Sequence, residues 1–348
     1  DRRRWLCPRR RRGRTLGAAA PLAVRRPPSR IAPLPAGVPD VLDFPRDIQP
    51  LLDRHCVGCH DYRKGDRGGP RAGKVILTGD HGPMFSHSYY VLTVLGQFRD
   101  GRNQPRSNYA PRQLGSSASP ILTKVGAPGM RRPDGKTHHD VKLSPREIDS
   151  IRLWIDSGAA YPGTYASLGS GCIGGYYENR SVENDFNWPE TNAARQVLAR
   201  RCDKCHADKM RLPHAMSDEI NLSFWKPGMG DPRLSWSRHV MFNLSRPELS
   251  LLLLAPLSKD AGGYGMADRD EKTGAVKRCM SVFESTEDAD YQTLLAWVQA
   301  GKKRLEEKGR FDMTAFRPPM PYIREMQRYG ILPKTLKPGE KVDYYAAD

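Results

Sequence analysis

The chain has 348 residues, a length that suggests about two domains. It carries 56 Lys and Arg against 39 Asp and Glu, for a formal net charge of +17, and only 38% of its residues are hydrophobic. The charge is uneven, because residues 1–30 hold 11 Arg against one Asp, which leaves +7 for residues 31–348. The longest apolar run, Leu249–Leu257, is too short to cross a bilayer, so we expect no transmembrane segment.

Residues 1–40 are rich in Arg and Pro. We predict a disordered leader here and no nucleic-acid partner, because the arginines are not interleaved with aromatic residues. The chain begins with Asp rather than Met, as a fragment or a processed product would. Residues 9–24 faintly imitate a signal peptide, but Pro21 interrupts a weak apolar stretch, and no signal peptide is identified.

The pentapeptide Cys56-Val-Gly-Cys59-His60 recurs as Cys202-Asp-Lys-Cys205-His206. C-x-x-C-H is the attachment signature of a c-type haem, in which two thiols bind one porphyrin and the histidine is the proximal iron ligand. Two copies predict two covalently bound haems. The alternative is that the two cysteine pairs bind zinc. The C-x-x-C pairs of a zinc site normally lie about 15–20 residues apart, much closer than Cys56 and Cys202 do here, and a zinc site does not require the histidine.

Each pentapeptide follows apolar residues with helical spacing, Ile48, Leu51 and Leu52 in one case and Ala194, Val197 and Leu198 in the other. A second pair of predicted helices carries Trp154 and Trp297 and is expected to end at Gly158 and Gly301. The first of these begins with a capping box, Ser144-Pro-Arg-Glu147. The motif histidine precedes the tryptophan by 94 residues in one copy and by 91 in the other.

This repetition predicts a mainly α protein with two tandem cytochrome c-like modules, long irregular loops and little sheet. The predicted organisation is a leader over 1–40, a first haem module over 41–161, a connector over 162–190, a second haem module over 191–310 and a Pro-rich tail over 311–348 with one short helix near Tyr322–Tyr329.

Three segments carry a further resemblance: Val75–Tyr90, Ser217–Trp225 and Ser237–Pro247. In amino-acid sequence, the chain resembles at these segments the dihaem cytochrome c region of planctomycete proteins related to the hydrazine synthase alpha subunit. The resemblance covers about residues 44–330. The resemblance implies two haems in a helical fold. A tyrosine close after C-x-x-C-H is a feature of the catalytic haem of hydrazine synthase, and Tyr62 is therefore a candidate catalytic residue.

The sixth ligand of each iron separates electron transfer from catalysis, because bis-His or His/Met ligation closes the iron to substrates. Repeat symmetry pairs His87 with His239, which follow their motif histidines by 27 and 33 residues. Resemblance to simple cytochromes c favours a ligand just before the tryptophan helix instead, which selects His138 or His139 in the first module and Met280 or Cys279 in the second. The other candidates are His81, Met84, His214 and Met266.

His87 has a second possible role. With His81, Tyr89 and Tyr90 it forms a polar and aromatic cluster that would move protons near an open haem, or simply pack at the porphyrin edge. The primary functional prediction is a dihaem c-type cytochrome that transfers electrons. The alternative is a haem enzyme of nitrogen-compound or peroxide chemistry with the first haem catalytic.

The expected partners are a redox protein and a catalytic subunit or domain missing from this chain. Covalent haem attachment takes place outside the cytoplasm, so we expect a periplasmic or equivalent location. Cys7, Cys172 and Cys279 remain unassigned; a Cys172–Cys279 disulfide would suit such a compartment, and unpaired thiols are the alternative.

Overall fold

The computed structural model describes most of the chain. The described residues are 26–28, 33–65, 70, 72–73, 75–99, 101, 108–130, 134, 136–164, 166, 185–206, 211–218, 237–265, 267–269, 276–279, 282–336 and 340–345. The chain divides into two compact units, residues 1–35 and residues 36–348. The second unit thus begins before residue 41, the predicted start of the first module, and Val38 is already buried in its core.

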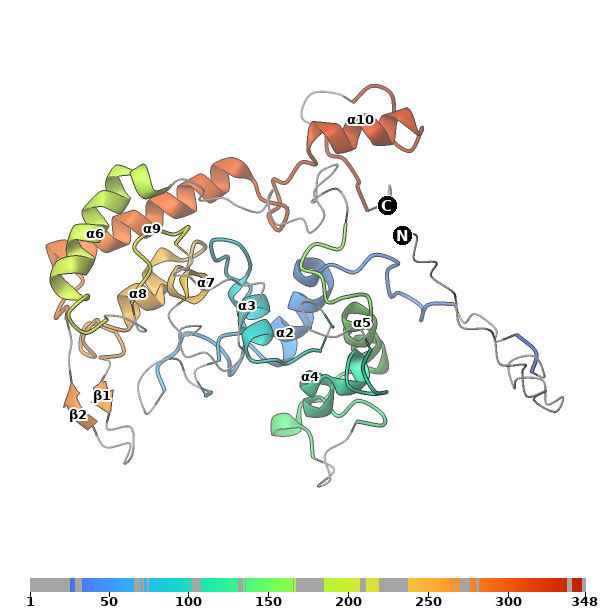
Figure 1. Cartoon of the computed structure of the whole chain (residues 1–348), viewed down its shortest axis with the longest axis horizontal. Coiled ribbons are helices and arrows are strands. Elements are labelled where there is room, and N and C mark those ends of the chain that lie inside the picture. The colour runs from blue at the N-terminus through green and yellow to red at the C-terminus, as the bar shows by residue number, and fades with distance from the viewer. Residues whose placement is uncertain are drawn as a thin grey trace, which may run out of the picture. The chain divides into compact units, whose positions relative to one another are not determined.

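Helices predominate in this part of the chain, which confirms the mainly α prediction (Figure 1). The helices are α2 (Gln49–His55), α3 (His87–Val94), α4 (Pro120–Lys124), α5 (Pro145–Asp156), α6 (Pro189–Arg201), α7 (Arg238–Met241), α8 (Leu251–Leu254), α9 (Ala289–Lys308) and α10 (Met320–Arg328). A π-helical turn over Phe44–Ile48 leads into α2, and 3₁₀ turns cover Ser116–Ala118, His138–Asp140, Asp185–Asn187 and Pro247–Leu249.

The described residues also contain one small β-hairpin, which the sequence did not predict. Strands β1 (Ala267–Arg269) and β2 (Val276–Cys279) pair antiparallel, with Ala267 opposite Cys279 and an irregularity after Asp268.

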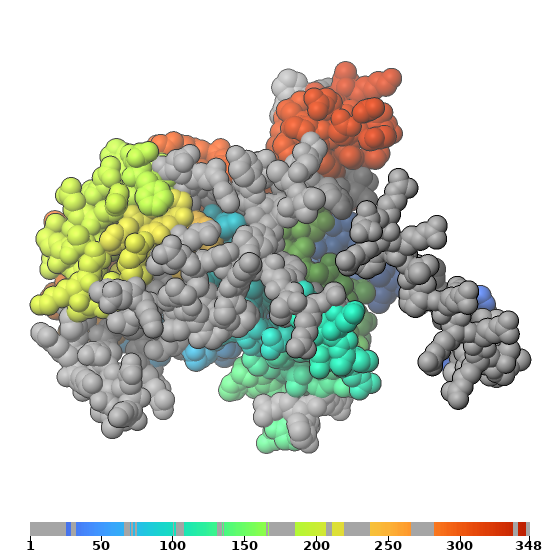
Figure 2. Space-filling view, in the orientation of Figure 1, coloured from blue at the N-terminus to red at the C-terminus, as the bar shows by residue number. Residues whose placement is uncertain are grey.

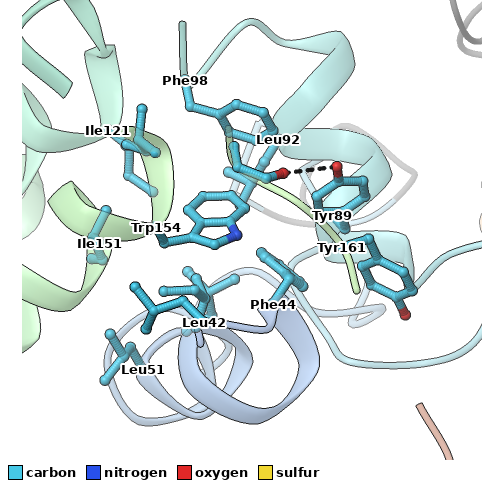
Figure 3. Packing of buried hydrophobic residues seen from close by; sticks show 14 of the residues in the cluster. Leu42, Phe44, Leu51, Tyr89, Leu92, Phe98, Ile121, Ile151, Trp154 and Tyr161 are labelled. Carbon is cyan, nitrogen blue, oxygen red and sulfur yellow. Dashed lines mark hydrogen bonds between the residues drawn. The ribbon is translucent and has the colours of Figure 1, made fainter. Parts of the chain in front are cut away.

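The first hydrophobic core surrounds Trp154 of α5, which is fully buried (Figure 3). Its ring lies 5.3 Å from Phe44 and 5.0 Å from Phe98, measured between ring centroids, and its Nε1 donates to the Ala160 carbonyl at 2.8 Å. The predicted capping box begins α5: Ser144 accepts from the Glu147 backbone, and the Glu147 side chain accepts from the Ser144 backbone. Gly158, at φ +104°, follows the helix as predicted.

The second core lies between α6 and α9, which run side by side (Figure 1). The buried positions of α6 are Thr191, Ala194, Val197 and Leu198, and the opposite face of the helix forms the yellow-green surface in Figure 2. Trp297 of α9 is fully buried, and its Nε1 donates to Thr191 Oγ1 at 2.8 Å. Each core therefore joins a helix that leads into C-x-x-C-H to a helix that carries a buried tryptophan.

The expected end of the second tryptophan helix at Gly301 is wrong. Helix α9 continues through Gly301 to Lys308 and ends at Gly309, which has φ +60°. A Cβ at Gly301 would collide with the Met216 side chain, so this glycine permits close packing inside the helix rather than ending it. Glycine at a helix end and glycine at a close contact look alike in the sequence.

An ion-pair arrangement is shared by the two halves of the protein, where the first half is residues 41–161 and the second half is residues 191–310, the ranges of the two predicted modules. Arg54 and His55, directly before Cys56, contact Glu147 Oε1 in the first turn of α5 at 2.9 and 3.1 Å. In the second half Arg201, directly before Cys202, contacts Asp290 and Asp288 at the start of α9 at 2.8 and 2.9 Å. Arg200 also pairs with Asp290.

The tail predicted over 311–348 contains α10 and packs at two places. At its start, Phe311 packs in the first core. Asp312, which forms a buried ion pair with Arg310, accepts a hydrogen bond from Tyr161 Oη at 2.6 Å. Its end returns to the first half, where the Tyr345 hydroxyl donates to buried Asp43. None of the helices in the described ranges is long and apolar enough to cross a membrane.

Candidate functional site

The two C-x-x-C-H turns have the same backbone hydrogen bonds. Cys59 and His60 donate to the Cys56 carbonyl at 3.0 and 2.9 Å, and Cys205 and His206 donate to the Cys202 carbonyl at the same two distances. Upstream, Cys56 donates to Leu52 and Cys202 donates to Leu198, both at 2.8 Å. The predicted helices are confirmed, and each ends directly before its first cysteine.

Within each motif the two thiols meet different surroundings. Cys56 and Cys202 pack against the first and second cores, whereas Cys59 and Cys205 are exposed, and all four are free thiols. Burial raises the pKa of Cys56 to about 11, with Cys59 adding to the rise, and burial likewise raises the pKa of Cys202 to about 11. A group attached to both sulfurs of one motif would lie at the boundary between core and solvent.

His60 is held in one orientation by a main-chain acceptor. Its Nδ1 donates to the Val75 carbonyl at 3.2 Å, so the lone pair that a metal ion requires is on Nε2. Burial lowers the pKa of His60, the bond to Val75 opposes this, and nearby Lys124 and His139 lower it further. The imidazole is therefore neutral at pH 7, the form that binds metals.

The structure brings His138 opposite His60. The two ring centroids lie 5.9 Å apart, and the ring planes differ by 25°. Two imidazoles that bind one metal ion from opposite sides need centroids about 6 Å apart, since each metal–nitrogen bond is about 2 Å and the ring centre lies about 1 Å beyond. The 5.9 Å spacing of His60 and His138 agrees with this value, which makes His138 the candidate second ligand of an iron bound by His60.

His139 lies beside His138 but is exposed, and its ring is turned 78° from that of His138. Both His139 and Asp140 have positive φ, 49° and 57°, a conformation rarely adopted by residues other than glycine. Strained backbone of this kind is often found at functional sites, because surrounding contacts must maintain it. Of the two adjacent histidines that the sequence could not separate, the structure places His138 toward His60.

The second motif has no described counterpart of His138. Met280 and Met266 lie outside the described residues, as does Cys172. His214 contacts Asp203, inside the second motif, at 3.0 Å between Nε2 and Oδ1. His239 is buried against the first half, with its ring 4.8 Å from Tyr90 and 5.7 Å from Phe85, and burial with the nearby cation Arg238 holds its pKa well below the usual range.

The two candidate catalytic residues, His87 and Tyr62, are hydrogen-bonded to each other. His87 Nε2 donates to the Phe242 carbonyl at 2.8 Å, so its Nδ1 accepts the Tyr62 hydroxyl. Both side chains are buried. Burial lowers the pKa of His87 and, together with the charge of Asp80, raises the pKa of Tyr62. Because both ring nitrogens of His87 contact protein atoms, this arrangement favours a hydrogen-bonding role over iron ligation.

Around this pair lie residues that the sequence analysis did not single out. Arg246 donates to Asp80 with two nitrogens, at 3.0 and 2.6 Å, and Thr78 donates to Asp80 at 2.7 Å. Tyr264 Oη donates to the Tyr62 carbonyl at 2.6 Å. The bonds of Arg246 and Tyr264 join the loop after the first motif to residues more than 150 positions later, so only the tertiary structure reveals them.

His81 also belongs to the junction between the halves. Its Nδ1 lies 2.8 Å from Ser245 Oγ, its carbonyl accepts from the Leu244 backbone at 2.7 Å, and its Nε2 is 3.7 Å from Asp312 Oδ2.

Among the residues that the structure describes, no three His, Cys, Asp or Glu side chains form a group that would hold a bare metal ion. Comparison with family models, curated proteins and solved structures finds no match.

Proposed function

We propose that the protein is a dihaem c-type cytochrome that transfers electrons through two covalently bound haems. The observation that carries this proposal is the pair of C-x-x-C-H turns with matching backbone geometry, one of which has a second imidazole 5.9 Å from its histidine. Each turn follows a helix packed on a helix with a buried tryptophan, as expected of two tandem cytochrome c-like modules.

The residues present fit haem c. Cys56 and Cys59 would hold the first haem and Cys202 and Cys205 the second, with His60 and His206 as proximal ligands. When bound, each haem would supply a one-electron iron couple. In the first half, the Val75 carbonyl keeps the His60 lone pair on Nε2, and His138 supplies the candidate sixth ligand. Ligation from both sides would favour electron transfer over substrate binding.

The proposed partner is a soluble or membrane-attached redox protein outside the cytoplasm, since covalent haem attachment takes place there. The resemblance to the dihaem region of hydrazine synthase-related proteins supports the haem content and suggests a catalytic domain or subunit as one electron donor or acceptor.

The direct test is haem stoichiometry. The chain is produced in a bacterial periplasm together with a c-type maturation system, purified, and assayed as the reduced pyridine haemochromogen. We expect two c-type haems per chain that stay attached on denaturation. Fewer than two, or a haem that is extracted by acidic acetone, would contradict the proposal.

A second candidate is a haem enzyme of nitrogen-compound or peroxide chemistry with the first haem catalytic. The buried Tyr62–His87 hydrogen bond favours it, because Tyr62 lies two residues beyond His60 and the bond places a hydroxyl and an imidazole, two groups used in acid–base catalysis, directly after the first motif. This candidate requires a high-spin iron that binds cyanide or hydroxylamine. Entirely low-spin spectra that neither ligand changes would rule it out.

A further inference from the structure

Each of the two segments that fix His60 makes a contact with the half of the protein that carries the second motif. The first is the loop directly after His60, whose Tyr62 carbonyl accepts Tyr264 Oη at 2.6 Å. The second is the segment at Val75, which accepts His60 Nδ1, and whose Leu77 backbone donates to the His60 carbonyl at 2.9 Å. His60 is therefore positioned by its own loop and by one neighbouring segment.

A small hydrophobic cluster joins these segments to the second half. Tyr62 and Ile76 come from the first half, and Leu254 and Tyr264 from the second; all four are buried. Ile76 is only 1% exposed and lies between Val75 and Leu77, the two residues bonded to His60. Through Tyr62 and Ile76, Tyr264 and Leu254 thus contact both segments that position His60, while Val75 and Leu77 themselves pack on the first core.

Tyr264 is itself held rigidly. Its backbone donates to the Leu254 carbonyl at 2.8 Å, and the ring is 2% exposed. The preceding Gly263 approaches the Leu257 backbone so closely that a Cβ would collide with it. The tyrosine therefore presents its hydroxyl to the Tyr62 carbonyl from a fixed turn.

We propose that Tyr264 is a positioning residue through which the second half sets the ligand geometry, and hence the reduction potential, of the first haem. The proposal rests on the proposed dihaem function. Its physical basis is general: the groups that orient a metal-bound histidine also tune its basicity and the properties of the metal. The two haem-bearing halves are then coupled by protein contacts in addition to any electron exchange.

The test compares Tyr264→Phe with a matched control, Tyr89→Phe. Both substitutions delete a buried hydroxyl that donates to a backbone carbonyl, but Tyr89 Oη contacts Ala159 at 3.0 Å and its ring packs in the Trp154 core. Both potentials are measured by spectroelectrochemical titration of the holoprotein, and the g values of each iron by electron paramagnetic resonance. The His138→Ala variant identifies the signal of the first haem.

We expect Tyr264→Phe to change the reduced-to-oxidised ratio of the first haem at a fixed potential by about threefold, or about 28 mV at 59 mV per tenfold change. Its g values should shift, while the second haem and both haems of Tyr89→Phe stay unchanged. Unchanged first-haem signals, or equal shifts in the control, would overturn the proposal even if both haems are present.

If Tyr264→Phe fails to retain two haems, Ile76→Val applies the same criteria, because it thins the same cluster by one methyl group. A shift confined to the first haem would support the proposal, and no shift would overturn it. Absence of covalent haem from the unaltered protein would instead refute the proposed function, so the two failures are distinguishable.

Discussion

The first and second halves of the protein share a framework but complete it differently. In both, a helix leads into C-x-x-C-H, basic residues before the first cysteine pair with a carboxylate at the start of a second helix, and that helix buries a tryptophan. The tryptophan partners differ: Trp154 donates to the Ala160 carbonyl just after its own helix, whereas Trp297 donates across to Thr191 on α6. The comparison indicates that backbone geometry, apolar packing and the ion pair before the first cysteine are repeated, while the hydrogen-bond partner of the tryptophan is specific to each half.

The strongest way to separate the halves is to remove one cysteine pair at a time. Cys56→Ser with Cys59→Ser, and Cys202→Ser with Cys205→Ser, should each reduce the covalent haem content from two per chain to one, because a thioether requires a thiol. The measurement is pyridine haemochromogen absorbance per chain, with haem staining of denatured protein. Two haems remaining in either variant would refute the attachment assignment.

The next contrast lies between two adjacent histidines of the first half. His138→Ala should convert one of the two irons from low-spin to high-spin and allow it to bind cyanide, since His138 faces His60. His139→Ala, the matched control, should leave the spin state of both irons unchanged because this side chain is exposed. Electron paramagnetic resonance of the oxidised protein distinguishes the outcomes. The assignment fails if the two variants behave alike.

The tryptophans provide a test of the differing polar contacts. Trp297→Phe leaves the fully buried Thr191 hydroxyl without its donor and should cost about 2–3 kcal/mol of unfolding free energy. Trp154→Phe should cost about 1–2 kcal/mol, because water can reach the half-buried Ala160 carbonyl. Urea unfolding measures both, with half-buried Trp188→Phe expected to stay within about 0.5 kcal/mol. Equal losses of unfolding free energy in Trp154→Phe and Trp297→Phe would contradict the predicted difference between the two tryptophan hydrogen bonds.

The smallest predicted effect concerns pH. Burial would raise the pKa of Glu147, but hydrogen bonds from the Ser144 backbone, His55 and Arg54 outweigh it and lower the pKa from 4.5 to about 2. A lowered folded-state pKa stabilises the fold above the ordinary value, and this contribution is lost as pH falls from about 4.5 toward 2.

Glu147→Gln should therefore lose about 1 kcal/mol less stability between pH 5 and pH 2.5 than the unaltered protein. Urea midpoints across this range provide the measurement. Glu190→Gln, at an exposed position of α6, is the control and should follow the unaltered protein. A midpoint profile of Glu147→Gln that parallels the unaltered one would remove Glu147 as a source of acid sensitivity.

Much of the fold could be read from local patterns. The helices before Cys56 and Cys202, the capping box at Ser144 and the buried tryptophans follow from spacing and short-range chemistry. Gly301 shows the limit of that approach, because its meaning depends on Met216, a residue 85 positions away in the sequence. The repeated pairing of Arg54 and Arg201 with carboxylates was also missed, although basic residues before each first cysteine were a visible signal.

The residues of the candidate site also fall into those that the sequence predicts and those that only the structure identifies. The sequence by itself determined the two cysteine pairs, their histidines and the turns that present them, because these depend on neighbours within a few residues. Only the tertiary structure selected His138 over His139, joined Tyr62 to His87, and placed Tyr264 on the loop after His60. Those contacts arise from packing between distant segments, for which no short-range pattern in a single sequence provides a signal.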